Sequence, residues 1–260
     1  MLININGNNL YIEYQKNFES KPTIVFLHDS LGCIELWRDF PKRISDACQC
    51  NLLIYDRLGY GKSDPMPSFF RKPNYLESEA EILNELLGVL NVENAILFGH
   101  SDGGSIALIA ASKFPERIKM IICEAAHIFV EEITLNGIKE AVEAYNTTNL
   151  SLKLQKYHGN KTETVFKAWT ETWLRDNFRN WNIEHLLSKI HSPLLFIQGE
   201  NDEYGTLDQV EKTLALVTGK SEKYIVPNAG HTPHKEVSDF VVSKTTEFIK
   251  NHLSTISQSN

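Results

Sequence analysis

The sequence contains no long apolar run. None of its 260 residues belongs to a stretch near the roughly 20 apolar residues that a membrane-spanning helix needs. The first residues, Met1–Asn6, also lack the basic start and the long apolar centre of a secretory signal peptide. We therefore expect a protein that stays in the cytoplasm and does not enter a membrane.

The sequence also has few cysteines and no excess of positive charge. Cys48 and Cys50 form a C-x-C pair that resembles half of a metal site, but no second pair of Cys or His lies near them. We therefore expect the 4 cysteines to be reduced, packed thiols. The 26 Lys and Arg are outnumbered by 33 Asp and Glu, which gives a net charge of −7. A surface that follows phosphates needs clustered positive charge, so nucleic acid is not an expected partner.

What the sequence does contain is an average globular composition and a regular order of segments. Hydrophobic residues make up 42% and charged residues 23%, which argues against a disordered or coiled-coil chain. Apolar runs without polar alternation predict buried strands. These runs lie at residues 22–27, 51–55, 95–98, 118–123, 193–198 and 223–227. Helical patterns separate most of them, so we predict an α/β fold with a mostly parallel sheet and helices on both faces.

The alternation of strand and helix stops within residues 130–191. Four helical patterns follow one another there, and strand patterns resume afterwards. We predict a core domain of residues 1–129 and 192–260, into which residues 130–191 are inserted as a helical lid. An opening hairpin, a closing helix and a loose tail after Leu253 complete the expected chain.

One segment organises the rest of the chain. Phe98–Gly104, with the sequence FGHSDGG, joins a strand pattern to a helical pattern. A strand that enters a helix through G-x-S-x-G is typical of a nucleophile elbow, whose sharp turn exposes a strained serine. Gly99 and Gly103 fit this turn, because a Cβ atom at either position would collide with the opposite limb. We therefore predict that Ser101 is a nucleophile rather than an ordinary loop serine.

Two further strand patterns end in residues that complement Ser101. Loops at the carboxyl ends of parallel strands converge at one crevice. Gly199–Gly205 follows one of these strands and contains Asp202, and Asn228–His234 follows the next and contains His231. The order Ser101, Asp202, His231 is the order expected of hydrolases with a nucleophile elbow.

On these residues the chain resembles the α/β-hydrolase fold superfamily, in its serine-nucleophile branch with a helical lid. The resemblance extends from the strand before His28 to the helix after His231. Within it, Asp56–Asp64 (DRLGYGKSD) is similar to the superfamily's D-x-x-G-x-G-x-S loop, and His28–Gly32 (HDSLG) is similar to its H-G-x-x-G loop. Asp29 stands where the superfamily usually has glycine.

The chemistry of a serine nucleophile assigns the other roles. A serine hydroxyl needs an adjacent imidazole to take its proton, for which we select His231, and a carboxylate to orient that imidazole, for which we select Asp202. The oxyanion of the tetrahedral intermediate needs preorganised N–H donors. By their positions in the resembling motifs, the backbone N–H groups of Ser30 and Asp102 form the expected oxyanion hole.

Neighbouring residues compete for these roles. His234 is an alternative base, or else it packs against or caps the closing helix, and His100 is more typical of a hydrogen-bonded core histidine. Glu200 and Glu203 compete with the chosen acid. The H-x-x-H motif that ends at His234 has no third ligand at a metal-binding spacing, so we expect no metal.

Other polar and aromatic residues have two interpretations each. The acids of the Asp56–Asp64 loop fit turn stabilisation better than catalysis, and Asp102 also fits a helix start, where a carboxylate is favourable. Trp169 and Trp173 lie four residues apart on one helical face, and either line an apolar pocket or belong to the core. His127 follows a strand and either contacts substrate there or does not.

We therefore expect a serine hydrolase that uses no cofactor. It would form an acyl-enzyme on a small or medium, partly apolar carboxylic ester, thioester, lactone or activated amide, as an esterase of EC 3.1 does. Carbon–carbon bond hydrolysis, perhydrolysis and lyase chemistry with the same triad are alternatives, and a non-catalytic ligand-binding module is the rival from another class. A serine at the elbow argues against the superfamily's haloalkane dehalogenases and epoxide hydrolases, whose nucleophile is a carboxylate. The expected partner is a small-molecule substrate, and monomer and homodimer stay open.

Overall fold

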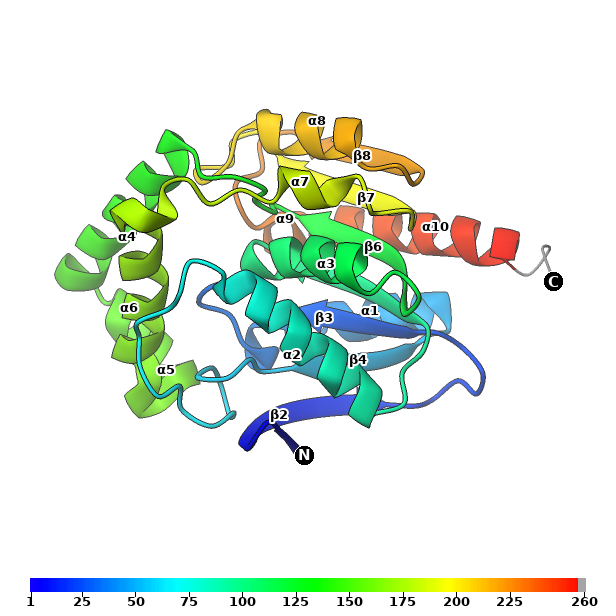
Figure 1. The fold of residues 1–260 in the computed structure, drawn as a ribbon, viewed down its shortest axis with the longest axis horizontal. Coiled ribbons are helices and arrows are strands. Elements are labelled where there is room, and N and C mark those ends of the chain that lie inside the picture. Colours follow the sequence, from blue (N-terminus) through cyan, green and yellow to red (C-terminus); the bar gives the residue numbers. More distant parts are fainter. Residues whose placement is uncertain (257–260) are drawn as a thin grey trace.

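Eight strands form one sheet in the computed structural model, which describes residues 1–256 (Figure 1). The strands are β1 (Leu2–Ile5), β2 (Asn8–Gln15), β3 (Thr23–Leu27), β4 (Asn51–Tyr55), β5 (Ala95–His100), β6 (Ile118–Glu124), β7 (Leu194–Gly199) and β8 (Ser221–Val226). Their order across the sheet is β1-β2-β4-β3-β5-β6-β7-β8. β2 pairs antiparallel with β1 and β4, and the remaining pairs are parallel. The predicted mostly parallel sheet is confirmed.

Helices cover both faces of this sheet, as predicted. The helices of residues 1–256 are α1 (Phe40–Cys48), α2 (Tyr75–Val89), α3 (Asp102–Lys113), α4 (Glu132–Thr147), α5 (Leu150–His158), α6 (Thr162–Trp173), α7 (Glu184–Leu187), α8 (Leu207–Leu216), α9 (Pro233–Glu236) and α10 (Ser238–Ile256). Short 3-10 turns lie at Ile34–Trp37, Gly159–Lys161 and Asp176–Phe178. Pro41 lies in the first turn of α1, where a helix needs no N–H from it.

Alternate residues of the inner strands face opposite helical layers. Val25 and Leu27 of β3 belong to the cluster that contains α2 and α3, while Ile24 and Phe26 belong to the cluster that contains α1 and α10. All four side chains are fully buried. Burial on both faces explains the uninterrupted apolar runs, and each such side chain contributes about 1.5–3 kcal/mol to stability.

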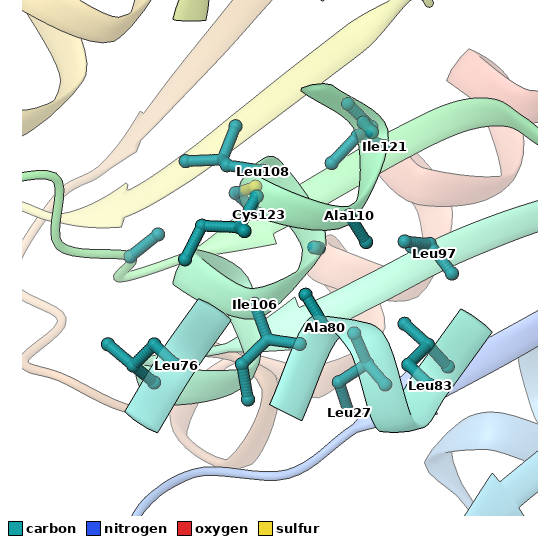
Figure 2. Packing of buried hydrophobic residues seen from close by; sticks show 14 of the residues in the cluster. Leu27, Leu76, Ala80, Leu83, Leu97, Ile106, Leu108, Ala110, Ile121 and Cys123 are labelled. Carbon is teal, nitrogen blue, oxygen red and sulfur yellow. The ribbon is translucent and has the colours of Figure 1, made fainter. Parts of the chain in front are cut away.

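Helix α3, which begins directly after Ser101, is buried along nearly its whole length. Its residues from Asp102 to Ser112 are all buried. Figure 2 shows Ile106 of α3 beside Ala80 of α2, and Ala110 of α3 beside Leu97 of the inner strand β5. Because α3 is packed on nearly all sides, the turn that leads into it has a fixed position.

Helices α4 to α7 connect β6 to β7, within the segment predicted as an insertion. α4, α5 and α6 contact one another and lie together at one end of the sheet (Figure 1, left), whereas α7 contacts α3 and α8 of the core. Within residues 1–256, no helix combines the length and the apolar character that crossing a membrane requires.

Two features differ from the sequence prediction. Helix α8 was not predicted, because its buried face carries Gln209 and Thr213 beside Val210 and so lacks an apolar stripe. A loose tail was expected after Leu253, but residues 254–256 continue α10. The rest of that expected tail, residues 257–260, lies outside the described residues.

Candidate active site

Ser101 lies in the turn between β5 and α3. Its backbone has φ 54° and ψ −120°, a conformation that residues with a Cβ atom rarely adopt. Backbone hydrogen bonds hold it there: the Ser101 N–H donates to Glu124 O at 2.8 Å, and Ser101 O accepts from the Gly104 N–H at 2.8 Å. Such a conformation costs about 1–3 kcal/mol, which these bonds and the buried helix α3 offset.

The two glycines of the turn are required by close backbone contacts. A Cβ atom on Gly99 would lie 2.1 Å from Gly103 O, which is the predicted collision with the opposite limb. A Cβ atom on Gly103 would instead lie 2.0 Å from Leu27 O. The prediction for Gly103 was therefore wrong in its partner, because the neighbouring strand β3 passes closer to this residue than the opposite limb does.

The His231 side chain connects Ser101 to Asp202. His231 follows β8 and Asp202 follows β7, so sheet order brings both toward the end of β5. His231 Nε2 lies 3.0 Å from Ser101 Oγ, and His231 Nδ1 lies 2.9 Å from both carboxylate oxygens of Asp202. A carboxylate only accepts hydrogen bonds, so Nδ1 carries the ring proton and Nε2 accepts from the serine hydroxyl.

The pKa values of the imidazole and the carboxylate move apart. Burial alone would lower the pKa of His231, but the charge and hydrogen bonds of Asp202, followed by the charges of Glu203 and Asp29, raise it above its ordinary value. Burial would raise the pKa of Asp202, but His231 and a hydrogen bond from the Tyr204 N–H lower it. Asp202 is therefore ionised at neutral pH, and it stabilises the protonated form of His231.

The two histidines that competed with His231 make other contacts. His234 donates its Nδ1–H to Glu124 Oε2 at 2.5 Å, and its side chain is 3% exposed. His100 donates its Nε2–H to the backbone oxygen of His231 at 2.8 Å. His100 is therefore the hydrogen-bonded core histidine that was predicted, and Ser101 contacts the ring of His231.

The two competing acids bind backbone groups of the same loop. Glu200 Oε2 accepts the Asn228 N–H at 3.2 Å, and Glu203 Oε2 accepts the backbone N–H of His231 at 3.1 Å. Glu200, Asp202 and Glu203 all lie in the loop after β7. Of these three acids, Asp202 alone hydrogen-bonds the His231 ring within residues 1–256.

The acids of the loop after β4 stabilise turns, as predicted. Asp56 accepts the N–H groups of Ile34 at 2.7 Å and Lys62 at 2.8 Å, and Asp64 accepts a backbone N–H of β2 at 2.8 Å. Both carboxylates therefore have structural partners.

The residues predicted for the oxyanion hole lie beside Ser101. Ser30 and Asp102 both line the cavity next to the serine, and within residues 1–256 neither backbone N–H has a protein acceptor. Asp29, which replaces the usual glycine, shapes the loop that carries Ser30, because its carboxylate accepts the Leu31 N–H at 3.3 Å. Two unpaired N–H groups near a nucleophile can bind a developing oxyanion.

A cavity of about 110 Å³ adjoins Ser101. Its lining residues are Asp29, Ser30, Leu31, Ser101, Asp102, His127, Thr134, Ile138, Trp169, Trp173, Tyr204 and His231. Burial would raise the pKa of Asp29, but the nearby His100 ring, whose Nδ1 lies 3.7 Å from Asp29 Oδ1, holds it well below its usual range, so this carboxylate is ionised. The lining contains acids but neither Lys nor Arg.

Trp169 and Trp173 fit both of their interpretations. They line the cavity, and they are also buried, at 9% and 2% exposure. Trp173 Nε1 donates to Tyr75 OH at 2.9 Å, and that hydroxyl donates to Asp102 Oδ2 at 3.0 Å. The carboxylate of Asp102 thus links α6 to the elbow, which is more than the helix-start role considered from the sequence.

His127 also lines the cavity. Its Nε2 lies 3.1 Å from Tyr204 O, so Nε2 carries the ring proton and Nδ1 is an acceptor. Burial lowers the pKa of His127, and within the described residues its Nδ1 has no hydrogen-bond partner. A neutral ring with an unused acceptor thus lies near the serine.

Several cavity residues were missed by the sequence analysis. Thr134 and Ile138 come from α4, whose sequence carries only an ordinary amphipathic pattern. Tyr204 follows Asp202 by two residues at the same strand end, and this position was the one available signal for it.

The cysteines are free and buried, as predicted. Burial raises the pKa of Cys48 to about 11 and that of Cys50 to about 12. Within residues 1–256, one group has donor atoms spaced as a metal site requires, and it consists of His100, Glu124 and His234. Both carboxylate oxygens of Glu124 already accept hydrogen bonds from His234, whereas His100 Nδ1 has no hydrogen-bond partner among the described residues.

A family model described as the alpha/beta hydrolase fold matches residues 22–180, more than half of the chain. The chain belongs to this family. The match includes β3 to β6 and the turn with Ser101, and it ends before β7 and β8.

Relatives in the alpha/beta hydrolase family match nearly the whole chain. Human serine hydrolase BPHL is 26% identical over 256 residues, covering 94% of this chain and 84% of that protein. The 2-hydroxy-6-oxononadienedioate/2-hydroxy-6-oxononatrienedioate hydrolase of Escherichia coli (strain K12) is 24% identical over 90% of this chain and 88% of that protein. MGS-M2, an alpha/beta hydrolase enzyme from a Medee basin deep-sea metagenome library, has a similar crystal structure. Its TM-score is 0.79 at 19% identity, over 95% of this chain and 96% of that chain.

Proposed function

We propose that this alpha/beta hydrolase is an esterase-like serine hydrolase that works through an acyl-enzyme. The observation that carries the proposal is the His231 ring, which lies 3.0 Å from Ser101 Oγ and 2.9 Å from Asp202. A nucleophile, its base and the group that orients the base are then in contact.

In the first half-reaction, Ser101 Oγ attacks the carbonyl carbon while its proton moves to His231 Nε2. The N–H groups of Ser30 and Asp102 donate to the oxyanion of the tetrahedral intermediate. The intermediate collapses when His231 gives its proton to the leaving group, which leaves an acyl group on Ser101. A water molecule, deprotonated by His231, then attacks the acyl carbon and releases the acid and the free serine.

The lining of the cavity supports a proposal for the substrate class. Its lining combines two tryptophans with the ionised Asp29 and contains neither Lys nor Arg. A small or medium, partly apolar substrate that is neutral or positively charged fits this lining, whereas an anion would be repelled. The Escherichia coli relative is named for dioate substrates, which carry two carboxylates, so carbon–carbon cleavage of such a compound is the weaker candidate for this chain.

We further propose that α4 to α6 act as the lid, within the inserted segment 130–191. Trp169 and Trp173 would contact the apolar part of the substrate from the lid. His127 would contact the substrate from the wall of the cavity. The monomeric or dimeric state does not enter this mechanism.

The test is labelling with a fluorophosphonate probe, followed by peptide mapping and assays with short-chain p-nitrophenyl esters. We expect one probe per chain on Ser101, with labelling lost in Ser101→Ala and His231→Ala. The matched controls are Ser188→Ala and His185→Ala, because both residues are exposed. A wild-type protein that resists the probe and cleaves no ester, but binds small molecules in the cavity, would instead be a binding module.

A further inference from the structure

Glu124, the last residue of β6, contacts both the nucleophile and the loop that carries the base. Its backbone oxygen accepts the Ser101 N–H at 2.8 Å. Its carboxylate accepts two hydrogen bonds from His234, at 2.6 Å from the backbone N–H and at 2.5 Å from Nδ1–H. Through its main chain, Glu124 therefore binds the elbow. Through its side chain it binds the segment Asn228–His234, which we call the base loop.

The charges of this pair are fixed by their surroundings. Burial would raise the pKa of Glu124, but the charge and hydrogen bonds of His234, with a smaller effect of His100, lower it. Burial is the largest effect on His234 and lowers its pKa. Glu124 is therefore a carboxylate, and the side chains of Glu124 and His234 are 0% and 3% exposed. A buried carboxylate is costly unless its acceptors are filled, so the loop has one favourable position.

The base loop is held at a second point beside His231. His100, the last residue of β5, donates its Nε2–H to the backbone oxygen of His231 at 2.8 Å. The ring of His234 packs against Trp37, with ring centroids 4.8 Å apart. Residues from β5 and β6 thus hold both ends of the segment from His231 to His234, and the sheet register sets where His231 lies relative to Ser101.

We propose that Glu124 is a positioning residue for the base, a role that rests on the proposed hydrolase function. By holding His234, it keeps His231 Nε2 at 3.0 Å from Ser101 Oγ. Misplacement of a catalytic group by 1 Å costs up to about 100-fold in rate. The role depends on hydrogen-bond geometry and not on the negative charge of Glu124.

Two substitutions at position 124 separate geometry from charge. In Glu124→Gln, the amide oxygen still accepts the His234 N–H, and the amide N–H₂ donates to Nδ1 after the ring changes tautomer. In Glu124→Ala both bonds are lost. We expect kcat for a p-nitrophenyl ester to fall about 10- to 100-fold in Glu124→Ala with KM little changed, and to stay within about threefold of wild type in Glu124→Gln.

A second pair of variants gives the same test from the other side of the contact. The side-chain amide of His234→Asn can replace Nδ1–H as the donor, whereas His234→Leu removes it. We expect His234→Asn to retain activity and His234→Leu to lose as much as Glu124→Ala. This pair also decides the question if Glu124→Ala does not fold.

Asn51→Ala is the matched control for a merely structural loss. Its buried amide makes two hydrogen bonds to loop residues, Phe18 and Lys21, at the opposite end of the sheet. We expect this variant to unfold more easily while kcat per active site, counted by probe titration, is unchanged. Equal kcat per active site in Glu124→Ala and wild type would overturn the positioning role.

A readout that needs no turnover separates this inference from the proposed function. The His231 Nδ1–H that bonds Asp202 should give a low-field proton signal in NMR spectra, which Asp202→Asn abolishes. We expect Glu124→Ala to broaden or lose this signal and Glu124→Gln to keep it. An unchanged signal in Glu124→Ala would overturn the inference, whether or not the wild type hydrolyses esters.

Discussion

Two histidines three residues apart, His231 and His234, each form a pair with a carboxylate from another part of the chain. In the first, Asp202 raises the pKa of His231, whose side chain is 12% exposed and contacts Ser101. In the second, the more deeply buried His234 has a lowered pKa although it also bonds a carboxylate, Glu124. The pKa of the histidine is thus raised in one carboxylate–imidazole pair and lowered in the other.

Neighbouring charges and access to a cavity explain this difference. After Asp202, the residues that raise the pKa of His231 are Glu203 and Asp29, both negative. After burial, the residues that lower the pKa of His234 are His100 and Lys235, both positive when protonated. The His231 ring can act as a base because its second nitrogen, Nε2, reaches the Ser101 hydroxyl. The pair of His234 and Glu124 serves instead to fix the base loop.

The largest expected difference between the two pairs appears when each carboxylate is replaced by the corresponding amide. We expect Asp202→Asn to lower kcat about 10⁴-fold, because the amide N–H₂ turns the His231 ring to the wrong tautomer for accepting the serine proton. Glu124→Gln should cost at most about threefold. Steady-state kinetics on one ester decide the matter, and equal losses in the two variants would show that the pairs do not differ in role.

This contrast also shows what the sequence can predict. Ser101, Asp202 and His231 could be located because each follows a strand that is recognisable from its apolar run. The contact of Glu124 with His234 joins residues 110 positions apart, and it depends on the chain after β8 returning past β7 to the end of β6, which no local pattern encodes. Helix α8 was missed for a similar reason, because Gln209 and Thr213 fill its buried face through tertiary contacts.

The two carboxylates should also differ in their effect on the pH dependence of activity. The base must be unprotonated, so kcat/KM should fall as the pH drops through the pKa of His231, at a midpoint above the ordinary value of about 6.5. We expect Asp202→Asn to lower this midpoint by about 1–3 pH units, since the main opposing charge is removed. Glu124→Gln should leave the midpoint in place. A pH profile of kcat/KM for each variant measures this.

At the second pair, stability should decrease as the pH falls. The pKa of His234 is lowered in the folded chain, so the unfolded chain binds the proton more tightly. Stability is therefore full above about pH 6.5 and decreases below it, by up to about 1.4 kcal/mol per pH unit for one group.

We expect His234→Asn to reduce this slope, because asparagine does not titrate. Urea unfolding of wild type and variant at several pH values between 7.5 and 5.5 measures the slope. His28, His127 and His158 also have lowered pKa values and should maintain the remaining slope. An identical slope in the wild type and His234→Asn would contradict a lowered pKa at His234.

The positive φ of Ser101 sets a trade-off for this chain. Glycine adopts such a conformation without the penalty that a Cβ atom brings, so Ser101→Gly relieves about 1–3 kcal/mol and loses about 0.5–1 kcal/mol to greater freedom of the unfolded chain. Selection for thermal stability alone would therefore replace the proposed nucleophile. A thermostability screen of this protein needs a parallel activity screen at this position.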